Sequence, residues 1–168
     1  MIFVILGTQD KPFFRLVKEI EKQVIEKKIN EEVVVQAGIT EYKSKYIKMA
    51  NFMPMDEFEK NINDARIIIT HAGVGSIITA LKANKKIIAV PRLKKYGEHV
   101  NDHQLQIANT FENAGYLLVV NDTDNFENVL KRIEDFKPDV FITNQDKFVN
   151  RLENRIDKYL NKKVREIP

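Results

Sequence analysis

The chain has 168 residues and no cysteine, with hydrophobic residues at 43% and charged residues at 30%. This length and balance predict one globular domain with a single core, and they exclude a disulfide framework and any thiolate nucleophile or metal site. A formal net charge of +3 is too small to predict nucleic-acid binding. No apolar run approaches the roughly 20 residues that span a bilayer. The opening MIFVIL lacks the basic and cleavage regions of a signal peptide, so we expect a cytoplasmic protein.

The first half of the chain predicts alternating strands and helices. Residues 2–6 (IFVIL) are a continuous apolar run, as expected for a parallel strand covered on both faces. Pro12 begins a helix whose apolar residues recur at helical spacing. A strand at residues 32–36 precedes a weaker strand near residues 46–51, and Pro54 begins a short helix.

The second half continues the same alternation. Residues 66–70 (RIIIT) are a strongly apolar strand, followed by a helix over about residues 75–83 and a strand over residues 86–90. A helix over residues 102–113 precedes a strand over residues 116–120, and helices near residues 125–136 and 146–160 complete the pattern. Strands that alternate with helices, without a hairpin signal, predict an α/β fold: a single Rossmann-like domain on a doubly wound parallel sheet.

The segment HAGVGS, at residues 71–76, joins a strand to a helix. Gly73 and Gly75 remove side chains where the helix begins, so that backbone N–H groups and the positive end of the helix dipole face outward. Phosphates bind to such groups. Ser76 can cap the turn or donate to a phosphate. A tight turn alone would also explain the glycines, and neither a dinucleotide fingerprint nor a P-loop is present.

A second polar loop, residues 91–104, carries three cations, among them Arg92, and two histidines. Such groups suit a diphosphate. Because ligands bind at the carboxyl ends of parallel strands, this loop should share an edge of the sheet with the glycine turn. His99 and His103 have the spacing of paired metal ligands, but no third ligand of matching spacing is nearby, and we expect no metal.

Residues 122–124 (DTD) have the Asp-x-Asp spacing that binds a divalent ion in one large class of sugar-nucleotide enzymes. They stand just before a predicted helix, where Asp and Thr act as N-caps. We therefore favour helix capping over metal binding for this segment.

The segment from His71 to Gly115 and the opening VILGTQDKPFFRLV resemble the C-terminal domain of glycosyltransferase family 28. Within it, the likeness is to short bacterial capsule and exopolysaccharide subunits. These are related to the eukaryotic subunit that adds the second N-acetylglucosamine of the dolichol-linked oligosaccharide. The resemblance covers almost the whole chain, and VPRLKKYGEHVNDHQ is a specific signal. It implies the C-terminal half of a GT-B fold, which binds a UDP-sugar.

The resemblance also implies roles for residues of the loops. His71 and His103 would assist the departing group, while the base that deprotonates the acceptor would lie in a partner. Thr79 stands where many relatives have a glutamate that binds the ribose, which leaves the ribose contact open. The implied donor-binding residues are Gly7, Thr8, Gly73, Gly75, Ser76, Arg92, Glu98, His99, Asn101 and Gln104.

The implied enzyme requires a second chain. A GT-B enzyme closes two Rossmann-like domains around the reaction, and 168 residues provide one. The acceptor half would come from a membrane-anchored glycosyltransferase subunit that holds a lipid-linked saccharide. Residues 146–168, an apolar helical stripe with a basic end, would contact this partner or pack on their own domain. The chain would be recruited to the inner face of the membrane, with a UDP-sugar as substrate and no cofactor.

Two other functions remain open. A non-catalytic sugar-nucleotide-binding or regulatory module would use the same loops. A Rossmann-type oxidoreductase is disfavoured, because G-x-G-x-x-G is missing after the first strand and no acidic residue ends the second. The transferred sugar is also open, since galactose, glucuronic acid and N-acetylglucosamine are all compatible with the resemblance.

Overall fold

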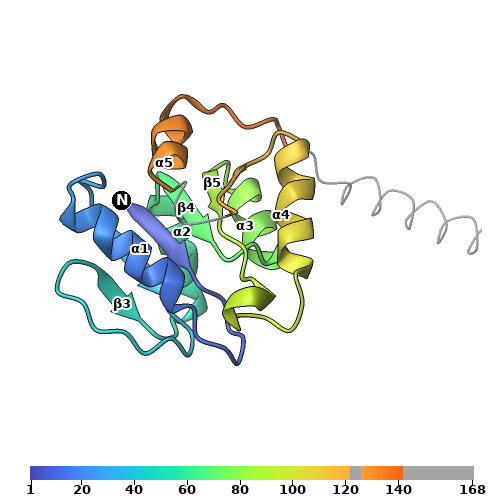
Figure 1. The fold of residues 1–168 in the computed structure, drawn as a ribbon. Helices are drawn as coiled ribbons and strands as arrows, with labels where there is room; N and C mark the ends of the chain where they lie inside the picture. The colour runs from blue at the N-terminus through green and yellow to red at the C-terminus, as the bar shows by residue number, and fades with distance from the viewer. Residues whose placement is uncertain (122–125, 142–168) are drawn as a thin grey trace, which may run out of the picture.

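In the computed structural model, which describes residues 1–121 and 126–141, helices cover both faces of a parallel sheet (Figure 1). The strands are β1 (Ile2–Ile5), β2 (Val33–Gln36), β3 (Lys48–Ala50), β4 (Ile67–Thr70), β5 (Lys86–Ala89) and β6 (Leu118–Val119). Their order is β3-β2-β1-β4-β5-β6, and every pairing is parallel. This order confirms the predicted doubly wound sheet of a single Rossmann-like domain.

The helices alternate with the strands along the chain. They are α1 (Phe14–Ile25), α2 (Met55–Asp64), α3 (Val74–Lys82), α4 (His103–Asn113) and α5 (Phe126–Asp135), with a 3-10 turn, η1 (Lys94–Tyr96), that the sequence did not predict. No helix within residues 1–121 and 126–141 is long and apolar enough to cross a bilayer. The predicted helix at residues 146–160 and the DTD segment at residues 122–124 lie outside the described residues.

Two hydrophobic cores lie on the two faces of the sheet. Ile2 and Val4 of β1 pack with α1 and α5, whereas Phe3 and Ile5 pack with α2, α3 and α4. Side chains of a strand alternate between faces, so a strand covered on both faces is apolar at every position. All four residues of β1 and of β4 are buried, which explains their uninterrupted apolar runs.

The edge strand β3 is short and carries an exposed lysine. Lys48 pairs with Glu32 at this edge, and Lys48 itself is exposed. Charged side chains on an edge strand prevent further strands from pairing with it. One of the three residues of β3 is exposed and the other two are half-buried, which accounts for the weak apolar signal of the strand in the sequence.

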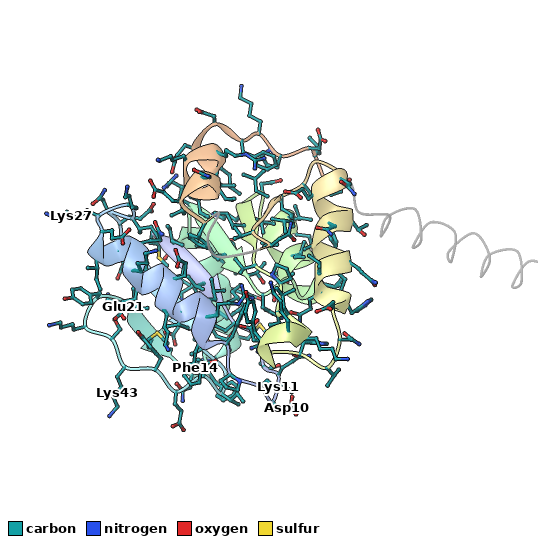
Figure 2. The ribbon with its side chains drawn as sticks, viewed as in Figure 1. Asp10, Lys11, Phe14, Glu21, Lys27 and Lys43 are labelled. Atoms are coloured by element: carbon teal, nitrogen blue, oxygen red, sulfur yellow. The ribbon has the colours of Figure 1, made fainter. Side chains whose placement is uncertain are left out.

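The carboxyl ends of the strands lie at the edge of the sheet opposite the chain start labelled N in Figure 1. Asp10 and Lys11, in the loop after β1, are labelled there in Figure 2, and Lys27 lies at the opposite edge. The chain leaves β1 towards β2 on one side and later returns to β4 on the other side. In such sheets ligands bind outside the carboxyl ends of the strands where this reversal occurs.

Candidate functional site

A cavity of about 400 Å³ opens at the reversal between β1 and β4. The loops after these two strands supply one part of its wall, and the end of β2, the segment after β3 and the start of α2 supply the other. Six of the predicted site residues line this cavity: Gly7, Thr8, His71, Gly73, Gly75 and Ser76. The structure therefore brings together six site residues from two segments more than sixty positions apart.

The turn between β4 and α3 presents unpaired amides to this cavity. Gly73 occupies the N-cap position, and in the described part of the chain no side chain caps the helix. The first N–H groups of a helix have no intrahelical partner, and together with the helix dipole they favour an anion. Ala72, buried before the cap, has φ of 67°, an uncommon conformation for a residue other than glycine. The turn is thus held in an unusual shape beside the cavity.

The absence of a side chain has a different consequence at each of the two glycines of the turn. A Cβ on Gly73 would lie 2.9 Å from His71 Cε1 and closer still to Nε2, while a Cβ on Gly7 would lie 2.7 Å from both atoms. The His71 ring is therefore held between Gly7 and Gly73. A Cβ on Gly75 would meet nothing within 4 Å, so the space in front of Gly75 is open to a ligand.

His71 is a neutral hydrogen-bond acceptor in this position. Only 8% of the residue is exposed, and Nδ1 lies 3.2 Å from the Ile5 carbonyl oxygen. Burial lowers the pKa of His71 to about 4, with smaller contributions from the charges of Arg92 and His99. Because Nδ1 donates its proton to the carbonyl, Nε2 carries the lone pair. His71 at neutral pH therefore offers an acceptor, and not a proton, for a departing group.

The low pKa of His71 predicts loss of stability in mild acid. An unfolded histidine has a pKa near 6.5, so between that value and about 4 the unfolded chain binds more protons than the folded chain. The free energy of unfolding should fall as the pH drops through this window, by on the order of 3 kcal/mol from His71 alone. Chemical denaturation across the window, compared between the wild type and His71→Gln, measures this contribution. The exposed His103→Gln should keep the wild-type profile; a His71→Gln profile equal to the wild type would contradict the assignment.

Arg92 is buried, whereas the sequence predicted a contact with the donor. Only 1% of the residue is exposed, and its guanidinium donates to the carbonyl oxygens of Leu6 at 2.8 Å and Lys11 at 2.7 Å. It also lies over the Phe13 ring, 4.7 Å from the ring centroid. Arg92 therefore holds both ends of the loop after β1, and its contact with a donor remains a prediction.

Glu98 is also buried and holds a neighbouring arginine that the sequence did not single out. Its two carboxylate oxygens accept hydrogen bonds from Arg15 Nε at 2.9 Å and from Nη2 at 2.8 Å. Arg15 in addition lies over the Tyr96 ring, 4.8 Å from its centroid. A bidentate ion pair of this kind fixes the relative orientation of the two side chains in addition to pairing their charges. Glu98 thus anchors the loop after β5 to the start of α1.

The remaining predicted residues of the second loop lie beside the first loop. The Gln9 amide nitrogen is 2.9 Å from His99 Nε2, and Gln104 is buried with its Oε1 accepting from the Arg92 backbone N–H at 3.2 Å. Asn101 Oδ1 accepts from the His103 N–H at 3.1 Å, which places His103, exposed, at the start of α4. None of His99, Asn101, His103 and Gln104 lines the cavity. The donor-binding roles of the first two and of Gln104, and the assistance of His103 to the departing group, stay predictions.

Thr79, at the position of the usual ribose-binding glutamate, makes a local contact. Its hydroxyl donates to the Gly75 carbonyl oxygen at 2.9 Å within α3, and the residue is exposed. Thr79 is not among the residues that line the cavity.

Sequence reasoning missed an apolar wall on the far side of the cavity. Phe52 is 61% exposed and Met55 is 71% exposed, although both are large and apolar. A buried glutamine stands beside them at the end of β2. The wall consists of Ile5, Gln36, Phe52, Met53, Met55 and Phe58. The available signal was the run NFMPM directly after a strand, for which only a helix start at Pro54 was predicted.

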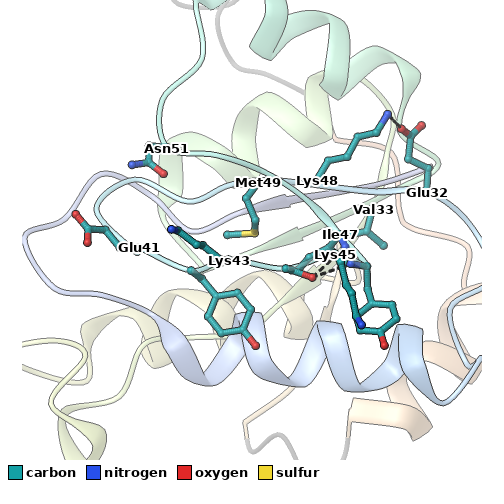
Figure 3. A pocket seen from close by; sticks show the side chains of 12 residues that line it. Glu32, Val33, Glu41, Lys43, Lys45, Ile47, Lys48, Met49 and Asn51 are labelled. Atoms are coloured by element: carbon teal, nitrogen blue, oxygen red, sulfur yellow. Dashed lines mark hydrogen bonds and ion pairs between the residues drawn. The ribbon is translucent and has the colours of Figure 1, made fainter.

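A larger hollow of about 1190 Å³ lies at the edge of the sheet, along the segment that leads to β3 (Figure 3). It shares no lining residue with the cavity at the glycine turn. Two of its charged residues, Lys48 and Glu32, form the ion pair drawn in Figure 3. Because it lies away from the reversal in strand order, we do not place the site there. Among the described residues there is also no group of three or more side chains suited to a metal ion.

A Rossmann-like sheet with an uncapped helix beside a cavity at the strand reversal defines a domain suited to a nucleotide phosphate. The profile of the glycosyltransferase family 28 C-terminal domain matches residues 1–163, so the chain belongs to this family.

Sequence relatives agree with this membership. The chain is 37% identical over 91 residues to the UDP-N-acetylglucosamine transferase subunit ALG13 of Candida glabrata, a match that covers 52% of this chain and 43% of that protein. The subunit of the same name in Candida albicans is 35% identical over 81 residues, which are 48% of this chain and 26% of that protein. The matched part is less than half the length of these curated relatives.

Solved structures show the same fold. The glycotransferase of kitacinnamycin superposes with a TM-score of 0.60 at 15% identity, over 79% of this chain and 34% of that chain. The solution structure of ALG13 superposes with a TM-score of 0.56 at 18% identity, over 90% of this chain and 93% of that chain. At these identities the likeness concerns the fold alone.

Proposed function

We propose that this chain is the donor-binding subunit of a two-chain inverting glycosyltransferase. It would transfer a sugar from a UDP-sugar to a lipid-linked acceptor in capsule or exopolysaccharide biosynthesis. The observation that supports the proposal is that the two ends of this cavity differ. One end has unpaired helix amides at Gly73 and Gly75, and the other has an apolar wall at Phe52 and Met55. A nucleoside diphosphate has the same two unlike parts. Membership of a glycosyltransferase family supports sugar transfer.

In this proposal the diphosphate lies against the start of α3. Gly75 leaves open space there, and the Ser76 side chain lines the same end of the cavity. Unpaired amides at a helix start bind phosphate oxygens and stabilise their charge. The base lies against the apolar wall, where Phe52 is exposed and can stack with it.

The reaction follows from this placement. The acceptor hydroxyl oxygen forms a bond with the anomeric carbon on the face opposite the diphosphate, and the bond from that carbon to the β-phosphate oxygen breaks. The electron pair leaves with UDP, whose new charge the helix amides stabilise, as oxyanion-binding groups do. His71 is a weak base because its pKa is about 4. The hydroxyl proton therefore passes to a base of the partner, and no metal is required for this step.

The partner in this proposal is a membrane-anchored, acceptor-binding glycosyltransferase subunit, which would recruit this otherwise cytoplasmic chain to the inner face of the membrane. Two observations support a partner. The ALG13 relatives are named as subunits of a UDP-N-acetylglucosamine transferase. The fold corresponds to about a third of the glycotransferase of kitacinnamycin. Galactose, glucuronic acid and N-acetylglucosamine all remain candidates for the sugar.

Calorimetric titration of the purified chain with UDP, ADP and NAD tests the donor assignment. We expect UDP to bind at least about 10-fold more tightly than ADP and NAD, since a cavity of about 400 Å³ accommodates a pyrimidine more readily than the larger purine. Equal or tighter binding of ADP or NAD would contradict the proposal. Sugar transfer by the chain reconstituted with its partner then separates an enzyme subunit from a binding module, because a module would bind UDP without supporting turnover.

A further inference from the structure

Gln36 is a buried polar side chain in the apolar part of the cavity. It ends β2, is 6% exposed and lines the cavity next to Phe52 and Met53. A buried amide without partners loses hydrogen bonds that it would make in water, so its partners are informative. Among the residues that the structure describes, one of its two side-chain polar atoms, Nε2, forms a hydrogen bond.

The protein fixes the orientation of this amide. Gln36 Nε2 donates to the backbone carbonyl oxygen of Asn51 at 3.2 Å, and that oxygen also accepts from the Gly38 N–H at 2.7 Å. A carbonyl oxygen accepts hydrogen bonds only, so the amide cannot be reversed without placing two oxygens against each other. Within residues 1–121 and 126–141, the one side-chain hydrogen bond of Gln36 is made by Nε2, and Oε1 is not among the fully enclosed unpaired atoms, so Oε1 is open to the cavity. The free acceptor is therefore held in a fixed orientation.

We propose that Gln36 determines which base the cavity accepts, by taking a hydrogen bond on Oε1 from the imide N–H of uracil or thymine. The inference rests on the proposed function, in which the base lies against the apolar wall. Cytosine presents a lone pair at the same ring position, and adenine presents no imide N–H. Cytosine would therefore place an acceptor against the fixed oxygen, and adenine would leave that oxygen without a donor. A polar group that a ligand buries without a hydrogen-bond partner lowers the affinity.

The remaining walls support a planar ring at this place. Phe58 packs edge-on against Phe3, with ring centroids 5.5 Å apart, so this part of the wall is anchored in the core. Phe52 and Met55 are exposed large apolar side chains at the mouth. Apolar walls with a few oriented polar groups are typical of small-molecule sites, in which the polar groups supply specificity.

The test compares UDP, CDP and UDP methylated at the imide nitrogen, by calorimetry on the wild type and Gln36→Leu. We expect the wild type to prefer UDP over CDP by about 100-fold and over the methylated ligand by about 10-fold or more. For Gln36→Leu, both preferences should shrink to within about 3-fold. Gln23→Leu is the matched control, because Gln23 is a buried glutamine of α1, 2% exposed and away from the cavity, and it should keep both preferences.

The outcomes separate this inference from the proposed function. UDP binding with undiminished preferences in Gln36→Leu would overturn the role of Gln36 and leave the donor assignment intact. Failure of the wild type to bind UDP would overturn the donor assignment, and the inference with it. The methylated ligand tests the folded wild type, so the contact can be refuted even if Gln36→Leu does not fold.

Discussion

Gly75→Asp should abolish UDP binding while it leaves the fold intact. Gly75 lies in the first turn of α3, its Cβ position is open, and its backbone conformation is not the left-handed one. An acidic residue near a helix start stabilises the helix by about 0.3–1 kcal/mol. The same carboxylate would occupy the place of the diphosphate and repel it, so UDP affinity should fall by at least about 100-fold.

Two further substitutions at Gly75 separate the effect of charge from the effects of side-chain size and helix stability. Gly75→Asn has the size of aspartate without its charge, and we expect a loss of only about 10-fold from steric exclusion. Gly75→Ala should raise the free energy of unfolding by about 0.5–1 kcal/mol, since glycine weakens a helix. Calorimetry with UDP and chemical denaturation measure both properties. Wild-type UDP affinity in Gly75→Asp would show that no diphosphate approaches this turn.

Arg92→Met should cost about 3 kcal/mol of the free energy of unfolding. Methionine can fill much of the space, but it cannot donate to the Leu6 and Lys11 carbonyl oxygens that the guanidinium now satisfies. Buried carbonyl groups that lose their donors carry the full cost of desolvation. Because these two carbonyls bracket Gly7 and Thr8, the wall of the cavity should loosen and UDP affinity should fall as well.

Arg66→Met is the matched control for Arg92→Met. Arg66 also bridges two segments, through Glu31 and Glu134, but its side chain is 45% exposed, at the opposite edge of the sheet. Exposed ion pairs contribute about 0–1 kcal/mol, so this substitution should have a small effect and leave UDP affinity unchanged. Denaturation curves for both variants give the comparison. Equal losses in the two variants would refute the role of Arg92 in holding the loop.

The order of elements was predictable because burial on both faces leaves a direct trace in the sequence. A strand covered on two sides is mostly apolar, and β1 and residues 67–69 of β4 are continuous apolar runs. The edge strand β3 gave a weak signal, since Lys48 faces solvent. The 3-10 turn η1 gave none, because a three-residue turn is too short to show a period.

The glycine turn was predictable for a similar local reason. An uncapped helix start after a buried strand places amides at the sheet edge, and the order β1-β4 puts this start beside the loop of Gly7. The placement of Arg92 and Glu98 was not predictable. A loop has no period that separates inward from outward side chains, so the charged run at residues 91–104 suggested a surface for phosphate, while the structure buries both side chains.

The sequence by itself determined the alternation of strands and helices, the parallel sheet and the helix start at which an anion can bind. Each leaves a local trace in the spacing of apolar, polar and glycine residues along the chain. Only the tertiary structure decided that the His71 ring lies between Gly7 and Gly73, and that Gln36 and Phe52 complete the cavity. These arrangements join residues from separate strands, and their geometry is set by how the strands pack side by side, which no local pattern records.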